Sequence, residues 1–264
     1  MLELNKVYNM DAFDMLKQID DSSVDLFIAD PDYNVGIKYN NKSYKTTFDN
    51  YISTYISLAS EAHRILKDSG NAVFINYDKN NSYLRVMYLD RAFYEVANYV
   101  WAYPTNTGFS PNKLTTAHRS ILHARKSKDS QMYKDQIAED YRNPTDKRIR
   151  RLIKGGSKGR MPYSWRITNQ VKNVSKIKGS ISHHPCVIPD DITALFINGM
   201  TKPKDVVVIP YAGSGSELMV AKKLGRSFVS SEIDGDFCER IDRKLDLEVL
   251  TFMEGIDNGK SDRV

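Results

Sequence analysis

A short apolar run, residues 24–29, stops abruptly at Asp30 and Pro31. Such a run is typical of a strand buried on both faces of a parallel sheet, and the proline marks its end because it cannot donate to a neighbouring strand. Asp30 is therefore expected at the carboxyl end of a strand. In open α/β sheets, ligands bind at that edge.

The four residues from Asp30 to Tyr33 indicate what this edge could bind. The Asp30 carboxylate and the Pro31 carbonyl offer two fixed acceptors for one NH2 group, and Tyr33 adds a flat surface for stacking. The amino group of a nucleobase is a poor nucleophile because its lone pair is delocalised, so acceptors that favour a pyramidal nitrogen would help it attack. This chemistry suits methyl transfer to an exocyclic amine. An Asp-Pro turn after a strand is, however, also common without any function.

The chain of 264 residues is long enough for one large α/β domain with an insertion, or for two small domains. We find no run of eighteen apolar residues and no basic-plus-apolar leader, so a soluble, cytoplasmic protein is expected. Cys186 and Cys238 lie too far from other candidate ligands to form a disulfide framework or a zinc site. Both are expected to be small buried residues, and no metal site is predicted.

The excess positive charge lies in one segment. Residues 113–178 contain 18 lysines and arginines against 5 aspartates and glutamates, whereas the remaining residues have 20 against 28. Aromatic residues are interleaved with these cations, at Tyr133, Tyr141, Tyr163 and Trp165. A basic and aromatic surface is what contact with phosphates and bases requires, although a solvated lysine-rich surface has the same composition.

Helical and strand patterns alternate along the chain in the rhythm of a parallel sheet. Helices are expected over 12–19, 51–66, 80–93, 190–198, 217–224 and 236–250, and strands over 7–8, 24–29, 72–77, 94–103, 205–210 and 226–233. The rhythm stops after Pro104. Residues 105–180, with one short strand over 120–124, are therefore expected to form an insertion outside the sheet. A mobile loop is expected over 34–49 and a frayed tail over 253–264.

A second candidate site lies where the strand that ends near Pro210 runs into Gly213 and Gly215. Two glycines here allow a tight turn into a helix, where the backbone can approach a ligand closely. Glu232 follows Gly213 by 19 residues at the end of the next expected strand, where an acid can hydrogen-bond the hydroxyls of a ribose. The turn lacks the six-position pyrophosphate fingerprint, and no Gly-Lys-Ser/Thr follows. A nucleoside with little or no phosphate therefore fits better than a nucleotide.

Together these motifs resemble those of the circularly permuted beta class of amino-group DNA methyltransferases. In that family a catalytic Asp-Pro-Pro-Tyr motif comes first, a target-recognition region follows, and a Phe-x-Gly-x-Gly motif that binds S-adenosylmethionine comes last. The matching stretches are 9–11, 23–34, 66–70, 184–185 and 211–234. The resemblance implies a Rossmann-like, mostly parallel and doubly wound methyltransferase sheet, formed by residues 1–104 and 181–252. Residues 105–180 would be the inserted target-recognition region.

The resemblance also implies roles for individual residues. Asp30 and the Pro31 carbonyl would hold the target amine, and Tyr33 would stack on the base after it has been flipped out of the duplex. Asp11 would bind the adenine edge of the cofactor, S-adenosylmethionine, and Glu232 its ribose. The residues expected around the cofactor are Asp11, Asp30, His184, Pro185, Tyr211, Ala212, Gly213, Ser214, Gly215, Ser216, Glu232 and Ile233.

Double-stranded DNA would be gripped and its bases recognised by the basic insertion. The cations expected at that interface are Lys113, Arg119, Arg148, Arg151, Lys158, Arg160 and Arg166. No membrane partner is expected. The resemblance is compatible with a homodimer and with a cognate restriction endonuclease, and the residues decide neither. The protein would be associated with the nucleoid of a prokaryotic cell, or lie in the host cytoplasm if it is viral.

Because the tetrapeptide begins with Asp and not Ser, the chain resembles the adenine-N6 enzymes more than the cytosine-N4 enzymes. The expected activity is site-specific methylation of adenine N6. Alternatives are cytosine-N4 methylation, a catalytically silent DNA-binding subunit, and a nucleotide-dependent oxidoreductase. The incomplete pyrophosphate fingerprint and the basic insertion argue against the last of these.

Three departures from the family pattern are visible. Asp32 replaces the second proline of the catalytic motif, which adds a negative charge near the sulfonium of the cofactor. Ile209 stands where an aspartate usually precedes the Pro-Phe of the glycine motif, and Ile188 stands where a lysine commonly follows His-Pro. Weak cofactor affinity is a hypothesis that follows from these changes.

Overall fold

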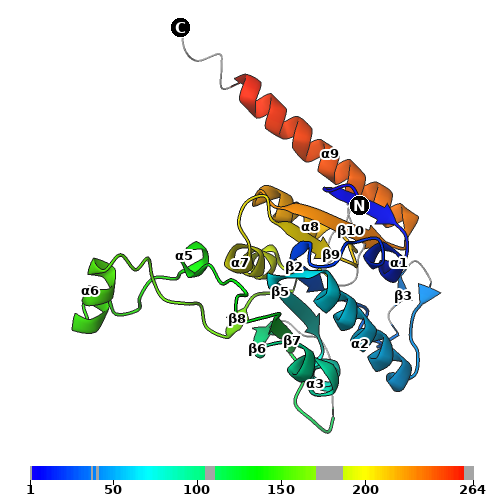
Figure 1. The fold of residues 1–264 in the computed structure, drawn as a ribbon, viewed down its shortest axis with the longest axis horizontal. Coiled ribbons are helices and arrows are strands. Elements are labelled where there is room, and N and C mark those ends of the chain that lie inside the picture. The colour runs from blue at the N-terminus through cyan, green and yellow to red at the C-terminus, as the bar shows by residue number, and fades with distance from the viewer. Residues whose placement is uncertain (1, 37, 40–41, 105–110, 171–186, 259–264) are drawn as a thin grey trace.

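The computed structural model describes residues 2–36, 38–39, 42–104, 111–170 and 187–258 (Figure 1). Its centre is an eight-stranded sheet with the order β1-β10-β9-β2-β5-β7-β6-β8. The strands are β1 (Lys6–Asn9), β2 (Val24–Ala29), β5 (Leu66–Asn76), β6 (Glu95–Ala102), β7 (His118–Arg125), β8 (Trp165–Ile167), β9 (Val206–Ile209) and β10 (Ser227–Glu232). All neighbouring strands are parallel except the two pairs that include β7. The prediction of a mostly parallel sheet is confirmed.

Helices cover both faces of this sheet (Figure 1). One face packs against α1 (Ala12–Leu16), α2 (Phe48–Ile65), α3 (Asp78–Leu84) and the π-helix η1 (Arg85–Leu89), which continues into α4 (Asp90–Ala92). The other face packs against α7 (Asp190–Met200), α8 (Ser216–Lys223) and α9 (Gly235–Asn258). This is the doubly wound arrangement expected from the sequence.

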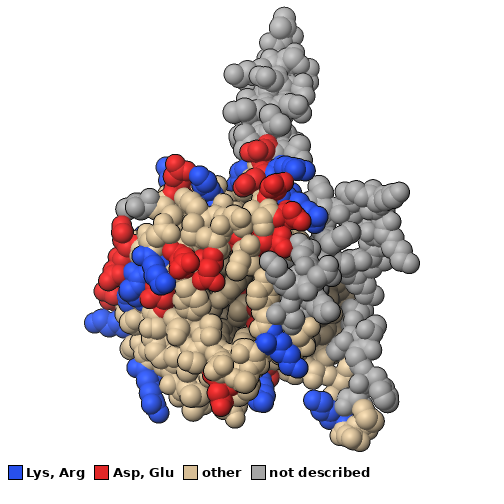
Figure 2. Space-filling view, turned by 90° about the vertical axis from the view of Figure 1, so that its right-hand side faces the viewer, with Lys and Arg blue, Asp and Glu red and all other residues tan. Residues whose placement is uncertain are grey.

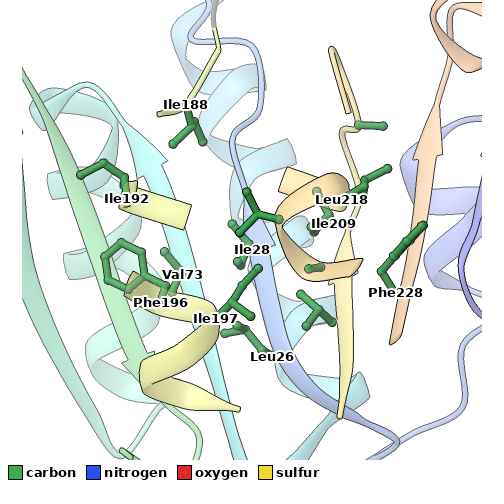
Figure 3. Packing of buried hydrophobic residues seen from close by; sticks show 14 of the residues in the cluster. Leu26, Ile28, Val73, Ile188, Ile192, Phe196, Ile197, Ile209, Leu218 and Phe228 are labelled. Atoms are coloured by element: carbon green, nitrogen blue, oxygen red, sulfur yellow. The ribbon is translucent and has the colours of Figure 1, made fainter. Parts of the chain in front are cut away.

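The burial of β2 on both faces explains its apolar sequence. Leu26 and Ile28 point toward α7 and α8, where they pack with residues such as Ile197 and Leu218 (Figure 3). Phe27 points to the opposite face, where its ring lies 5.8 Å from that of Phe74. Because successive side chains of a strand alternate between faces, a strand covered on both sides needs an apolar run, which in β2 is unbroken from Leu26 to Ala29. Asp25, near the start of the strand, forms an ion pair of 2.8 Å with Lys67.

Several expected element bounds are wrong. The first helix ends at Leu16, three residues early, and the region of 34–49 includes a small hairpin of β3 (Lys38–Tyr39) and β4 (Lys42–Ser43). The strand expected over 72–77 begins earlier, because β5 starts at Leu66 and continues through residues 67–70. The register against β2 shifts there, so that these residues bulge within the strand. The last helix extends to Asn258, beyond the expected start of the tail.

The expectation that residues 105–180 lie outside the sheet is wrong for two strands. β7 lies in the middle of the sheet, antiparallel to both β5 and β6, and β8 pairs with the outer side of β6. The short strand expected over 120–124 is confirmed but begins earlier, at His118, because its first residues are polar and do not show the pattern of a buried strand. The part that does project from the sheet carries α5 (Lys134–Ile137) and α6 (Lys147–Lys154), as Figure 1 shows.

Within the described part of the chain, no helix has both the length and the apolar character that a membrane span needs. Cys238 is buried and free, as expected. Cys186 lies outside the described residues.

Candidate active site

A cavity of about 330 Å³ opens at the carboxyl edge of the sheet. Four of its walls come from the ends of parallel strands: Asp11 follows β1, Asp30 follows β2, Tyr211 follows β9, and Glu232 ends β10. The prediction that Asp30 lies at the carboxyl end of a strand is confirmed. The fold thus brings the Asp-Pro motif and the glycine turn, far apart in the sequence, to one cavity.

The glycine turn has the backbone conformation that only glycine adopts easily. Gly213 and Gly215 have positive φ angles of 52° and 76°, and Gly215 forms the N-cap of α8. A Cβ on Gly215 would lie 2.8 Å from Cγ1 of Ile241. The turn therefore needs glycine both for its conformation and for its close packing against α9.

Glu232 fixes the other side of this turn. Its Oε2 accepts a hydrogen bond of 2.9 Å from the amide of Gly213, and its Oε1 accepts one of 2.9 Å from the amide of Asp234. Burial raises the pKa of Glu232, while these backbone hydrogen bonds favour its charged form. Its carboxylate lines the cavity next to Gly213, with acceptor capacity for the hydroxyls of a ribose.

Most of the residues expected around a cofactor lie together. Asp11, Asp30, Tyr211, Ala212, Gly213, Ser214, Glu232 and Ile233 line the cavity. Gly215 and Ser216 are not among its lining residues and lie at the start of α8. Asp11 also caps α1, because it accepts a hydrogen bond of 2.8 Å from the amide of Phe13. His184 and Pro185 lie outside the described residues.

Two acidic residues of the cavity, Asp234 and Glu217, were not among the expected site residues. Glu217 lies on the first turn of α8. It is only 7% exposed and accepts a hydrogen bond of 3.0 Å from the hydroxyl of Ser216. Burial, assisted by the negative charge of Asp30, raises the pKa of Glu217 to about 7. An acid directly after the Gly-Ser-Gly-Ser turn was the available signal, because the first turn of that helix had to face the same sheet edge.

The wall residues of the cavity give it a negative character. They include six carboxylates, at Asp11, Asp30, Asp32, Glu217, Glu232 and Asp234, and the described lining has no lysine, arginine or histidine. Figure 2 shows a hollowed face of the molecule on which acidic side chains gather. Such a cavity favours a ligand that carries positive charge.

Asp30 has an unusual protonation equilibrium. Burial, assisted by the charge of Asp32, raises its pKa to about 7, although a hydrogen bond from Tyr33 and the charge of Arg119 act in the opposite direction. The Tyr33 hydroxyl donates that hydrogen bond to Oδ1 of Asp30. The carboxylate is therefore already engaged by a donor in this structure.

The ring of Tyr33, which is expected to stack on a flipped base, is enclosed in this structure. Its side chain is only 7% exposed, Tyr77 packs edge-on against it at 5.1 Å, and the guanidinium of Arg119 lies 5.0 Å from its ring centroid. A hydrogen bond of 3.2 Å from Asn80 to the Tyr33 carbonyl further holds the motif in place. A base could reach the face of this ring only after these groups move.

Asp32, the departure from the family motif, is held at one oxygen only. Its Oδ2 accepts a hydrogen bond of 3.1 Å from the amide of Asn34, whereas the buried Oδ1 has no hydrogen-bond partner among the described residues. Burial raises the pKa of Asp32. An unpaired buried carboxylate oxygen is costly, which favours a protonated Asp32 or a cationic ligand beside it.

The cations expected to contact DNA fall into two groups. Lys113, Arg148, Arg151 and Lys158 are exposed, two of them on α6. Arg160 and Arg166 form ion pairs with the two oxygens of Glu139, and Arg119 is buried. Other residues of the chain thus already engage the guanidinium groups of these last three, and their contact with DNA stays a prediction.

A doubly wound sheet with a glycine turn, a buried acid and an Asp-Pro motif around one cavity at its carboxyl edge has the fold of the S-adenosylmethionine-dependent DNA methyltransferases. The family model described as DNA methylase matches residues 24–243. The chain belongs to this family, which comprises adenine-N6 and cytosine-N4 methylases.

Curated relatives match over most of the chain. The Type II methyltransferase M.BglII of Bacillus subtilis is 28% identical over 250 residues, which cover 89% of this chain and 67% of that protein. The DNA adenine methyltransferase YhdJ of Escherichia coli (strain K12) is 25% identical over 258 residues, which cover 93% of this chain and 84% of that protein.

Solved structures share the fold at lower identity. The cytosine-N4-specific PvuII DNA methyltransferase superposes with a TM-score of 0.65 at 17% identity, covering 89% of this chain and 84% of that one. The complex of M1.HpyAVI with S-adenosylmethionine gives a TM-score of 0.58 at 18% identity, covering 90% and 98%.

Proposed function

We propose that this protein transfers a methyl group from S-adenosylmethionine to the N6 amine of adenine in double-stranded DNA. One observation carries the proposal: the fold holds the acceptor pair of Asp30 and Pro31 in the same cavity as the glycine turn and Glu232. A cofactor bound over the turn would then have its reactive end near the acceptors. Membership of the DNA methylase family supports the reaction class.

The residues present fit this cofactor. S-adenosylmethionine supplies an electrophilic methyl group on a positively charged sulfur, and the cavity is lined by carboxylates with no described cation. Glu232 would bind the ribose hydroxyls and Asp11 the adenine edge, while Tyr211 and Gly213 would line the sulfonium end. The structure of M1.HpyAVI bound to this cofactor, which has the same fold, supports the assignment.

Asp30 and Pro31 would act on the target amine. The carboxylate and the carbonyl would accept its two N–H groups, so that the nitrogen lone pair points at the methyl group. A bond from nitrogen to the methyl carbon forms as the carbon–sulfur bond breaks, in one direct displacement. Asp30 would stabilise the positive charge that develops on the nitrogen, and the extra proton would leave to solvent. For the amine to bind, the Tyr33 hydroxyl must first leave Asp30.

Adenine N6 is the preferred target within the proposal, because the motif begins with Asp and the relative YhdJ is named a DNA adenine methyltransferase. Cytosine N4 is the second candidate. The PvuII enzyme, which shares the fold, is cytosine-N4-specific, and cytosine offers the same kind of amine to Asp30.

The exposed cations Lys113, Arg148, Arg151 and Lys158 would contact the phosphates of DNA. They belong to residues 105–180, of which we propose that the part outside β7 and β8 recognises the target sequence. The relative named a Type II methyltransferase supports a site-specific modification role. In that setting a cognate restriction endonuclease and a homodimer remain predictions, as does the location of the protein with the DNA of its cell.

The test is to incubate the purified protein with labelled S-adenosylmethionine and unmethylated genomic DNA, and to analyse the digested nucleosides by mass spectrometry. N6-methyladenine is the expected product, and sequencing would locate the methylated site. If N4-methylcytosine appears instead, the target base is cytosine and not adenine. If neither base appears although the protein binds both DNA and cofactor, the chain is a silent DNA-binding subunit.

A further inference from the structure

Tyr33 contacts two groups of opposite charge. Its hydroxyl donates a hydrogen bond to Oδ1 of Asp30, and the guanidinium carbon of Arg119 lies 5.0 Å from the centroid of its ring. Arg119 is close enough that its charge lowers the pKa of Asp30. The same tyrosine thus contacts both the Asp30 carboxyl and the Arg119 guanidinium.

Arg119 is placed in this position by its strand and by a cage of tyrosines. It is 8% exposed on β7, and its guanidinium carbon lies 4.2 Å from the ring centroid of Tyr77 and 5.2 Å from that of Tyr103. Its Nη1 donates to the Tyr103 hydroxyl and, at 3.3 Å, to the carbonyl of His118. These contacts keep the pKa of Arg119 above its usual value in spite of burial.

The cage holds a charged group without an opposite charge in contact. No ion pair of Arg119 is found among the described residues, although a buried arginine is normally paired. A guanidinium presents five N–H donors in one plane, so its edge suits a flat ligand with an in-plane acceptor. A nucleobase held by Asp30 would be such a ligand.

We propose that Arg119 is a base-recognition residue, which donates a hydrogen bond to the ring nitrogen beside the target amine while Asp30 accepts one from the amine itself. This inference rests on the proposed function. Adenine has its N6 amine beside the acceptor N1, and cytosine has its N4 amine beside the acceptor N3. Both match an adjacent acceptor and donor, so the pair selects amino bases as a class.

The other two bases are mismatched at both atoms. Guanine and thymine present a carbonyl oxygen beside a ring N–H, which would set oxygen against the Asp30 carboxylate and N–H against the Arg119 guanidinium. Buried polar groups left unpaired in this way give strong discrimination. The Tyr33 hydroxyl offers the same donor and acceptor as an amino base, and it stands in for the base until one displaces it. Once displaced, the Tyr33 ring would be released for stacking.

The test uses a DNA duplex that contains the sequence the protein methylates. Its target adenine is replaced by 1-deazaadenine, in which a CH group takes the place of N1. A duplex with 7-deazaadenine, altered on the opposite edge, is the control. The single-turnover rate of methyl transfer by the wild-type protein should fall roughly 10- to 100-fold with 1-deazaadenine and little with 7-deazaadenine. Arg119→Met should be slow on adenine and lose nothing further on 1-deazaadenine.

Arg125→Met is the matched control, because Arg125 ends the same strand but pairs with Glu95 at 2.6 Å. This variant should keep the wild-type ratio of the methyl-transfer rates on adenine and 1-deazaadenine. Equal wild-type rates on adenine and 1-deazaadenine would overturn the inference, as would an Arg119→Met protein that still discriminates between them. Cofactor binding by Arg119→Met reports whether it is folded.

If Arg119→Met does not fold, Arg119→Lys takes its place, because lysine keeps the charge but lacks the planar donors. Its ratio of rates on adenine and 1-deazaadenine should be smaller than that of the wild type. An unchanged ratio would again contradict the inference. The unmodified duplex separates the two proposals: without methylation of it the proposed function itself fails. If cytosine is the target, 3-deazacytosine replaces 1-deazaadenine in the same design.

Discussion

The amide of Gly213 and the carboxylate of Glu232 are joined by a hydrogen bond of 2.9 Å, across the ends of two neighbouring parallel strands. This contact couples the glycine turn to the acid that is proposed to bind ribose. The second oxygen of Glu232 holds the amide of Asp234 in the same way. One carboxylate therefore shapes the cavity and presents its remaining acceptors to a ligand.

Replacement of Glu232 by Ala should weaken S-adenosylmethionine binding roughly 10- to 100-fold, because two backbone amides lose their acceptor and the ribose loses its partner. Isothermal titration calorimetry measures this. Glu239→Ala is the control, since Glu239 is exposed and pairs only with Arg243 on the surface of α9. If Glu232→Ala binds the cofactor as tightly as wild type, Glu232 is not the ribose ligand.

Asp30→Ala should abolish methyl transfer while cofactor binding persists, because the amine loses the acceptor that orients it. The measurement is methyl incorporation in parallel with calorimetric binding of S-adenosylmethionine. Asp20→Ala serves as the control, since Asp20 is an exposed aspartate in the turn before β2. Wild-type turnover by Asp30→Ala would contradict the mechanism.

The rate of methyl transfer should fall on the acidic side with an apparent pKa near 7, because burial raises the pKa of Asp30 to about that value and only its charged form is effective. Asp32→Asn should shift this acid limb to lower pH, since the negative charge of Asp32 raises the pKa of Asp30. Profiles of kcat against pH for the two proteins test this. An acid limb that does not move in Asp32→Asn would show that the two carboxyls do not interact.

Asp30 should also make the folded protein less stable at higher pH. Its pKa is raised from 3.8 to about 7 on folding, so the folded state binds the proton more tightly and loses stability as the pH rises between these values. Asp30→Asn removes this effect and should be more stable than wild type at pH 8 by about 1 to 3 kcal/mol. The gain should shrink at pH 5. Urea unfolding at both pH values measures it, and an equal gain at both would contradict the assignment.

Gly215→Ala should destabilise the protein by about 2 to 3 kcal/mol, because Gly215 has a φ of 76° and a Cβ would meet the buried Ile241 at 2.8 Å. Gly225→Ala is the matched control. Its φ is similar, at 74°, but the nearest atom to its Cβ would be 3.9 Å away. It should cost only about 1 kcal/mol, from backbone strain alone. Thermal unfolding measures the stability of both variants. Equal losses of stability would show that contact with Ile241 does not contribute.

The residues at the strand ends were predictable because their signals are local. An apolar run that stops at Asp30 and Pro31 predicts both a strand and its end. The glycines before α8, with an acid 19 residues later, predict the two strands that end at the glycine turn and at that acid. Since parallel strands share a carboxyl edge, Asp30 and Glu232 had to meet there. The structure confirms this meeting.

β7 was not predictable in the same way. Its first residues, His118, Arg119 and Ser120, are polar, and the pattern of a buried strand is lost in them. Polar residues of this strand are tolerated where they find a partner far away in the sequence: Ser120 donates to Asn98, and His123 hydrogen-bonds Asn71. Such pairings depend on the register of neighbouring strands, which local patterns do not encode.

The class of fold, the position of the Asp-Pro motif at a strand end and the glycine turn with its acid follow from local sequence, because proline, glycine and apolar periodicity set the chain conformation at these points. The charge of the cavity, the protonation of Asp30 and the enclosure of Arg119 by tyrosines depend on how the chain packs. These properties arise from burial and from side chains that meet across different strands, and burial is a property of the packed molecule.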